Sequence, residues 1–141
     1  MRKSVLTALL LCAGCLTACN SQSSAPESTE MQYIKTSVFY DTVMDMYQNP
    51  DNYLGKQYHM VGTLYEIEDD ETGEVFRSIY GTSPTDRGEG IGIELRWDNF
   101  EGIAADDKIT VEGTLDSEKG THDGEEREFL ILRVSMLEKR E

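Results

Sequence analysis

Two stretches of this chain share one pattern, and that pattern restricts the possible folds. Polar and apolar residues alternate over 57–67, and one face of that stretch carries Tyr58, Met60, Gly62 and Leu64. This period of two is what a strand needs to bury one of its sides. The alternation returns over 108–115, and both stretches contain the tripeptide Gly-Thr-Leu. Because glycine weakens an ordinary strand, Gly62 and Gly113 indicate the sharp bends of a small closed barrel.

Three further strands are expected over 74–80, 91–97 and 128–137, where apolar residues alternate with polar ones or run without interruption. In the first of these, Phe76, Ser78 and Tyr80 are placed toward the core and Arg77 and Ile79 toward solvent. The opposite orientation would bury an unpaired arginine, which costs more. In the second, Glu94 and Arg96 lie two apart on one face, which predicts a surface ion pair with a neighbouring strand.

A helix is expected over 37–47, ahead of the first strand. Its apolar stripe consists of Val38, Phe39, Thr42, Val43 and Met46, which recur at spacings of three and four. Thr36 or Ser37 is the expected N-cap, and Pro50 lies just beyond the helix. We expect the stripe to cover one end of the barrel.

The remaining connections are polar. Residues 69–73 superficially resemble a calcium loop but lack its full frame, so we predict a hairpin turn with Gly73 in the left-handed region. Residues 98–107 leave room for one helical turn near 100–105. Residues 116–127 are expected to form a charged loop. Weak calcium binding by Asp116, Glu118, Asp123 and Glu125 is an alternative there.

The N-terminus predicts export. Arg2 and Lys3 precede an apolar stretch over 5–14 that is too short to span a bilayer. The following Leu16-Thr17-Ala18-Cys19 resembles the lipobox of bacterial lipoproteins, which implies that Cys19 is diacylated and begins the mature protein. Residues 1–18 are then a lipoprotein signal peptide, and the localisation is the extracytoplasmic face of the cell membrane. The alternative is an ordinary signal peptide that is cleaved elsewhere.

Cleavage there determines what the mature chain contains. Cys12 and Cys15 are lost with the leader, so the domain is expected to have no disulfide and no thiolate metal site. We also expect no cofactor. Residues 19–35 are expected to be a disordered tether, because the stretch from Asn20 to about Met31 is polar and aperiodic. Twelve such residues would hold the domain about 20 Å from the membrane. One folded domain is expected over 36–141.

The charge argues against one class of partner. The chain carries 27 acidic and 13 basic residues, a formal charge of −14. Loss of Arg2 and Lys3 leaves 27 acidic against 11 basic residues, hence −16. Binding to nucleic acid depends on Lys and Arg that neutralise phosphates, so we expect no nucleic-acid partner.

Five strands with a short connector between the third and fourth fit an OB-fold. The stretch 47–56, then Val61-Gly62 and Val111–Thr114, resembles a group of small bacterial lipoproteins. It is also similar to the OB-type C-terminal domain of a predicted permease-subunit family. The resemblance implies an all-β, five-stranded, OB-fold-like Greek-key barrel with a short N-terminal α-helix. Many relatives carry cysteine where this chain has Thr85–Gly90, so no thiol-based role transfers.

No catalytic arrangement is apparent, and we expect a protein that is not an enzyme. His59 lies on the outward face of its strand, and the consecutive Thr121, His122 and Asp123 cannot form a relay because their side chains diverge. The first hypothesis is a binding module for an envelope protein or small ligand. Its expected contacts are Tyr65, Arg77, Ile79 and Arg96. The alternative is a cation-responsive accessory lipoprotein beside a membrane transporter, whose melting temperature would rise with calcium.

Overall fold

The computed structural model describes residues 30–70, 72–86, 88–122 and 125–141. The predicted signal peptide, Cys19 and most of the predicted tether lie outside the described residues. Within them, no helix is long and apolar enough to cross a bilayer.

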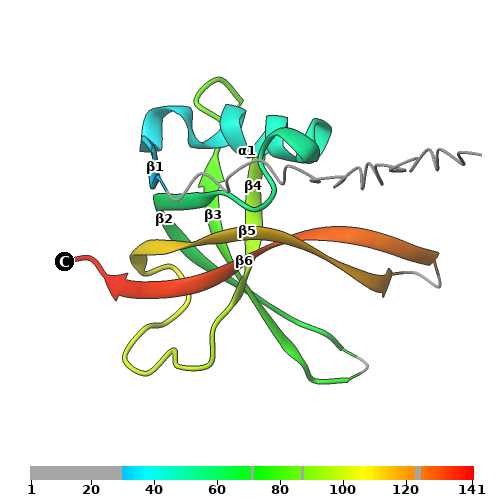
Figure 1. Ribbon diagram of the computed structural model, residues 1–141. Helices are drawn as coiled ribbons and strands as arrows, with labels where there is room; N and C mark the ends of the chain where they lie inside the picture. Colours follow the sequence, from blue (N-terminus) through cyan, green and yellow to red (C-terminus); the bar gives the residue numbers. More distant parts are fainter. Residues whose placement is uncertain (1–29, 71, 87, 123–124) are drawn as a thin grey trace, which may run out of the picture.

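Five strands form a closed barrel (Figure 1). They are β2 (Gln57–Glu68), β3 (Val75–Thr82), β4 (Gly90–Arg96), β5 (Lys108–His122) and β6 (Glu125–Lys139). Neighbours follow the order β2-β3-β4-β6-β5, and β5 pairs back with β2, so the sheet closes on itself. The β4–β6 pairing is parallel and the other four are antiparallel. This is the predicted five-stranded OB-fold barrel.

The two glycine-bearing strands close the barrel against each other. Residues Gln57 to Thr63 of β2 pair with Thr114 to Lys108 of β5, and the register of β5 against β6 shifts between Glu112 and Gly113. A Cβ on Gly113 would lie 2.5 Å from the Arg133 carbonyl oxygen. The glycine is therefore required by the close approach of β6, and the predicted irregularity is confirmed at this position.

The core follows the predicted alternation. Tyr58, Met60 and Leu64 of β2 are buried, as are Ile93 and Leu95 of β4 and Ile109, Val111 and Leu115 of β5. In β6 the uninterrupted apolar run buries Leu130, Ile131 and Leu132 together. Such a run is expected where a strand is covered on both faces.

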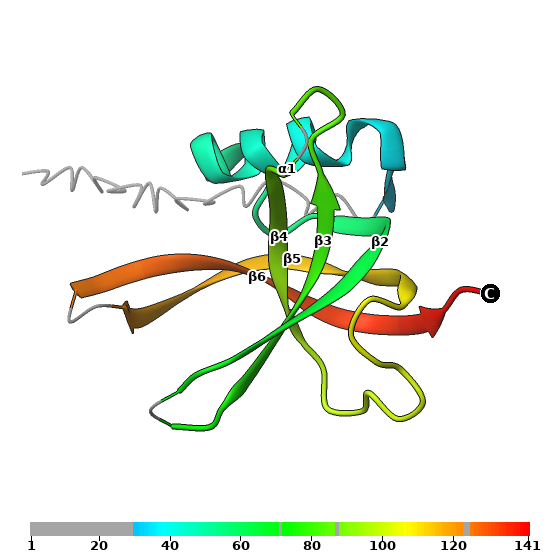
Figure 2. The same ribbon diagram turned by 180° about the vertical axis from the view of Figure 1, so that it is seen from behind.

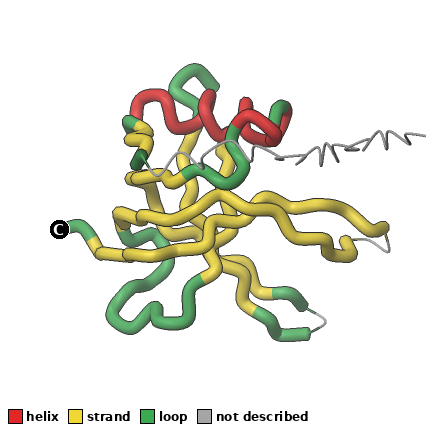
Figure 3. The backbone as a smooth tube through the Cα atoms, in the orientation of Figure 1, coloured by secondary structure: helices red, strands yellow, loops and turns green. Residues whose placement is uncertain are grey.

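Helix α1 (Phe39–Gln48) lies across the β3 and β4 end of the barrel (Figures 1 and 3). It buries Phe39, Val43 and Met46, as predicted, but Val38 is 45 % exposed and stands outside the stripe. The predicted caps are wrong, because Thr36 and Ser37 lie in a 3-10 turn, η1 (Thr36–Val38), and α1 starts without a side-chain cap. A second 3-10 turn, η2 (Pro50–Asn52), follows the helix.

The folded domain begins earlier than predicted. Strand β1 (Gln32–Ile34) pairs in parallel with Tyr58 to Met60 of β2, and Ile34 is buried. These residues fall within the predicted tether of residues 19–35, so the boundary at residue 36 is wrong. Three residues are too few to display a strand period.

The predicted loop over 116–127 is also wrong. Strands β5 and β6 continue as a hairpin arm to the pair His122 and Glu125, and only residues 123–124 separate them. Between residues 97 and 107 the chain forms hydrogen-bonded turns, from Ile103 to Phe100 and from Asp107 to Ala104, and the predicted helical turn is absent. The predicted hairpin turn at Gly73 is confirmed, since its φ is +69°.

Two hairpins project from the barrel. The arm formed by β5 and β6 and the arm formed by the ends of β2 and β3 diverge in both views (Figures 1 and 2). Each arm pairs only within itself near its tip, among the described residues.

Substitution Gly113→Ala tests the barrel closure. Because the new methyl group would meet a backbone oxygen, we expect a loss of about 1–3 kcal/mol in unfolding free energy, measured by urea denaturation. The matched control is Thr114→Val, which changes a partly exposed neighbour and should stay within about 0.5 kcal/mol. Equal stability of both variants would contradict the close approach of β6.

Candidate ligand-binding cleft

A cleft of about 490 Å³ lies between α1, the outer face of β3 and β4, and the two hairpin arms. We call it the β3–β4 cleft. Its lining consists of Tyr47 from α1, Ile67 from β2, Asp69 from the turn after β2, Phe76 and Ser78 from β3, Gly92, Glu94 and Arg96 from β4, Glu118, Lys119, Gly120 and Thr121 from β5, and Phe129 and Leu130 from β6. In an OB-fold, this face and the loops beside it form the usual contact surface for ligands.

The floor of the cleft is built from small residues. Ser78 and Gly92 lie on the outer face of the sheet, because the residues that follow them in their strands, Ile79 and Ile93, are fully buried on the inner face. A Cβ on Gly92 would lie 2.8 Å from the Ile79 carbonyl oxygen, and one on Gly120 would lie 3.1 Å from the Phe129 ring. Larger side chains at these positions would crowd β3 or displace the ring.

Apolar side chains form the walls. The described residues include seven large hydrophobic side chains that are exposed, and three of them, Tyr47, Ile67 and Phe76, line this cleft. Tyr47 comes from α1, and Ile67 and Phe76 are directly opposite each other in the β2–β3 hairpin. Phe129 of β6 adds a fourth apolar side chain from the opposite arm. The fold therefore gathers exposed apolar surface at one place.

Tyr47 fixes the helix against the sheet. Its hydroxyl donates a hydrogen bond of 2.8 Å to the carbonyl oxygen of Gly92. Tyr47 is only partly exposed, and the partial loss of water around it, followed by the charge of Glu94, raises the pKa of its hydroxyl above the ordinary value. Because the phenol stays protonated, it remains a donor to this carbonyl group of β4 at neutral pH.

An ion-pair network ties β4 to the β5–β6 arm. Arg96 donates from Nε and Nη2 to Glu118 Oε2, at 3.0 and 2.7 Å, and its Nη1 contacts Glu94. Arg133 donates from Nε to Asp116 at 2.6 Å and from Nη2 to Glu118 Oε1 at 3.1 Å. Hydrogen bonds from Arg96 lower the pKa of Glu118, and those from Arg133 lower the pKa of Asp116. The carboxylates of Glu94, Asp116 and Glu118 thus bind the guanidinium groups of Arg96 and Arg133.

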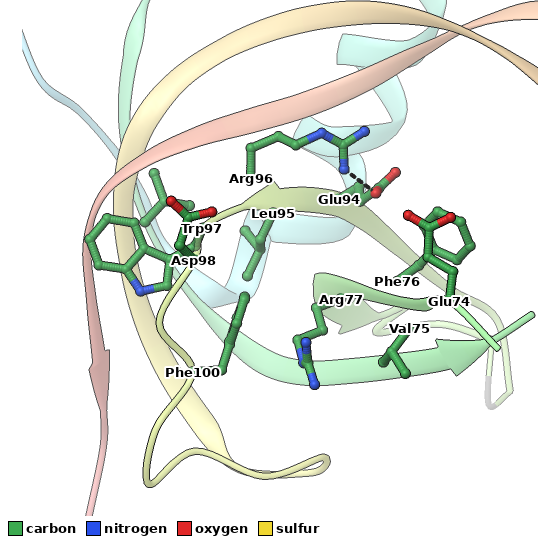
Figure 4. A pocket seen from close by; sticks show the side chains of 11 residues that line it. Glu74, Val75, Phe76, Arg77, Glu94, Leu95, Arg96, Trp97, Asp98 and Phe100 are labelled. Carbon is green, nitrogen blue, oxygen red and sulfur yellow. Dashed lines mark hydrogen bonds and ion pairs between the residues drawn. The ribbon is translucent and has the colours of Figure 1, made fainter.

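A second cavity, of about 480 Å³, lies beside the first and shares Phe76, Glu94 and Arg96 with it (Figure 4). We call it the Arg77 groove. The guanidinium carbon of Arg77 lies 4.7 Å from the centre of the Phe100 ring, and its Nε donates to Glu66 at 2.6 Å. The charge of Arg77 is therefore already compensated within the protein.

The four predicted ligand contacts do not form one site. Arg77 and Arg96 both line the Arg77 groove, and Arg96 also lines the β3–β4 cleft. Tyr65 is 45 % exposed on the outer face of β2 and stacks on Tyr80, with 5.2 Å between ring centres, but it lines neither cavity. Ile79 is fully buried, so its predicted outward orientation is wrong.

The predicted orientation of β3 failed for a physical reason. Ile79 opposes Leu64 across the β2–β3 pairing, and both fill the core. Arg77 lies two residues before Ile79 and therefore on the same face of β3. At Arg77, however, the β2–β3 hairpin already projects beyond the barrel. Glu66 and Phe100 compensate its partial burial, and Phe76 therefore points outward into the β3–β4 cleft.

The calcium alternative finds little support in the described residues. Asp116 and Glu118 are ion-paired with the arginines, and Glu125 contacts Arg127 at 2.9 Å. Asp123 lies outside the described residues. In the described part of the chain, no group of three or more His, Cys, Asp or Glu side chains could hold a metal ion.

The histidine predicted on the outward face of the first strand, His59, forms a contact between strands. Its Nδ1 lies 2.9 Å from Glu112 Oε1, across the pairing of β2 with β5.

Titration of the network tests its geometry. A lowered native pKa means that the stability contributed by Asp116 and Glu118 is present above about pH 4 and is lost as the pH falls through their native pKa values. We expect Arg96→Gln to raise the pKa of Glu118 and leave that of Asp116 unchanged, and Arg133→Gln to raise that of Asp116. Carboxyl shifts followed by NMR measure both values. An unchanged pKa of Glu118 in Arg96→Gln would contradict the network.

Comparison with solved structures gives distant similarities. The small single-stranded DNA-binding protein from Streptomyces coelicolor is 16 % identical, with a TM-score of 0.41, and the match covers 60 % of this chain and 93 % of that one. Rim1, a mitochondrial single-stranded DNA-binding protein from S. cerevisiae, is 18 % identical, with a TM-score of 0.37 and the same coverage. A comparison with curated proteins found no match.

A family model agrees with the resemblance found in the sequence. The model described as the DUF1980 C-terminal domain matches residues 17–141, which include every strand of the barrel and α1. The chain belongs to the DUF1980 C-terminal domain family.

Proposed function

We propose that this protein is a non-enzymatic binding module whose ligand occupies the β3–β4 cleft, and that a lipid on Cys19 anchors it to the extracytoplasmic face of the cell membrane. The observation that carries the proposal is the gathering of Tyr47, Ile67, Phe76 and Phe129 around a floor of small residues. Exposed apolar surface of this kind on a soluble domain is typical of an interaction site.

The charge of the protein supports a ligand other than nucleic acid. The chain has a formal charge of −14, and of the two basic residues that line the cleft, Lys119 and Arg96, Arg96 is held by Glu94 and Glu118. Binding of a phosphate backbone releases counterions only where Lys or Arg neutralises phosphates. We therefore favour an envelope protein or a small ligand over single-stranded DNA.

The anchor rests on the N-terminal sequence. A charged start, a short apolar segment and a cysteine after Leu16-Thr17-Ala18 coincide there. Two acyl chains contribute about 0.8 kcal/mol for each buried CH₂ group, which makes a dual anchor stable. The cleft would then face partners in the envelope.

Site-specific cross-linking in cells tests the binding site. A photoreactive phenylalanine analogue at Phe76 or Phe129 should form a covalent adduct, because both positions line the cleft. The same analogue at Tyr33, which is 71 % exposed on β1 and does not line it, serves as the control. Adducts at Tyr33 alone, or equal adducts at all three positions, would contradict the proposal.

Substitution of the lipid-bearing cysteine tests the anchor. We expect Cys19→Ser to release the protein from the membrane fraction, because no acyl chain can be added, and mass spectrometry of the wild-type N-terminus should detect a diacylated Cys19. The matched control is Cys15→Ser, which lies in the leader and should leave the mature protein membrane-bound. Membrane retention of Cys19→Ser would contradict the anchor.

A further inference from the structure

We infer that the occupant of the β3–β4 cleft is an extended segment of a partner protein in which Lys or Arg alternates with apolar residues, and that it pairs with the free edge of β6. This inference rests on the proposed function and adds the class of ligand and the mode of binding. Addition of a strand to an exposed sheet edge is a common mode of peptide recognition.

The free edge follows from the strand pairing. Strand β6 pairs with β5 along its whole length, from Glu125 onward. On its other side, β4 pairs with β6 only over Ile131 to Arg133. Among the described residues, no strand pairs with this second edge over 125–129. Its backbone N–H and C=O groups are therefore open to another chain.

This edge borders the β3–β4 cleft. The sheet order places β4 beside β6, and the cleft is lined by Gly92 and Glu94 on the β4 side and by Phe129 and Leu130 on the β6 side. Side chains of an added strand would point alternately to its two faces. Every second side chain would therefore lie on the face that carries the apolar wall of the cleft.

Charge selects the sequence of the partner. The free edge reads Glu125-Glu126-Arg127-Glu128; Arg127 is ion-paired with Glu125 at 2.9 Å, and Glu126 and Glu128 leave the edge with a net negative charge. Opposite charges across paired strands are favourable and like charges are unfavourable. A second copy of this chain would bring the same acidic edge, so self-pairing is disfavoured. The net charge of −14 also attracts a basic segment over a longer range.

Peptide binding to the full acylated protein tests the inference. The protein is placed in nanodiscs of neutral phosphatidylcholine, and fluorescence anisotropy measures binding of a labelled ten-residue peptide in which Lys alternates with Val or Phe. We expect binding by this peptide and none by the version with Glu in place of Lys. Oligo(dT) is the nucleic-acid probe and should not bind.

N-methylation identifies the mode of binding. Two methylated peptides are compared. In one, the methyl groups are on the alternate amides whose N–H groups would face β6, so the donors to β6 are lost. In the other, the methyl groups are on the remaining amides, so the donors to β6 are kept. We expect one pattern to weaken binding about tenfold or more and the other to have a small effect. Exchange of the amide protons over 125–129 should slow when the unmodified peptide binds. Equal effects of both patterns would overturn strand addition.

Charge reversal provides the matched pair of variants. Glu126→Lys on the free edge should weaken binding of the basic peptide about tenfold, whereas Glu101→Lys in the exposed turn after β4 changes the net charge equally and should not. Equal effects would overturn the assignment to the edge.

Failure of the inference can be separated from failure of the proposed function. Absent binding of the basic peptide, or binding of the acidic peptide or oligo(dT) instead, overturns the inference. If the adducts at Phe76 and Phe129 still form in cells, the cleft remains the binding site for another ligand. If those adducts are absent too, the proposed function fails with it.

Discussion

The backbone contact between β5 and β6 at Gly113 supports the rest of this structure. Because glycine has no side chain, the Arg133 carbonyl group of β6 can lie close to the Gly113 backbone of β5. The register between β5 and β6 shifts at this position. That irregularity falls where β5 also pairs with β2, at the pair Tyr58 and Gly113. The closed barrel buries the alternating apolar residues of β2, β4 and β5. Without closure, α1 would have no barrel end to cover.

The cleft follows from strands that are longer than the barrel needs. Beyond their shared pairing, the β2–β3 and β5–β6 arms diverge (Figure 1). Phe76 and Phe129, one on each arm, therefore line the cleft and not the core. Arg96 and Glu118 hold β4 to one of these arms by a bidentate contact with one carboxylate oxygen. Apolar walls, a floor without large side chains and an edge of β6 that no described strand covers over 125–129 therefore meet at one place, which is why we propose a binding role there.

The sequence predicted the barrel better than it predicted the site. Alternation and the repeated Gly-Thr-Leu identified the two strands that close the sheet, because both signals depend on local packing. The orientation of β3 depended on two partners that compensate the partial burial of Arg77, namely Glu66 directly opposite it on β2 and Phe100 in the turn after β4. The long arm was missed because charged residues follow Leu115, although Asp123-Gly124 is a strong hairpin signal. Strand β1 depends entirely on its pairing with β2.

Amide hydrogen exchange followed by NMR tests the closed barrel most directly. Amide protons that join β2 to β5 between Gln57 and Thr63 should exchange only through global unfolding, as slowly as those that join β5 to β6 near Leu115. A barrel that is open at this seam would give a different result. The β2–β5 amides would then exchange as rapidly as the turns over 98–106, while the β5–β6 amides stayed protected, and this would contradict the account.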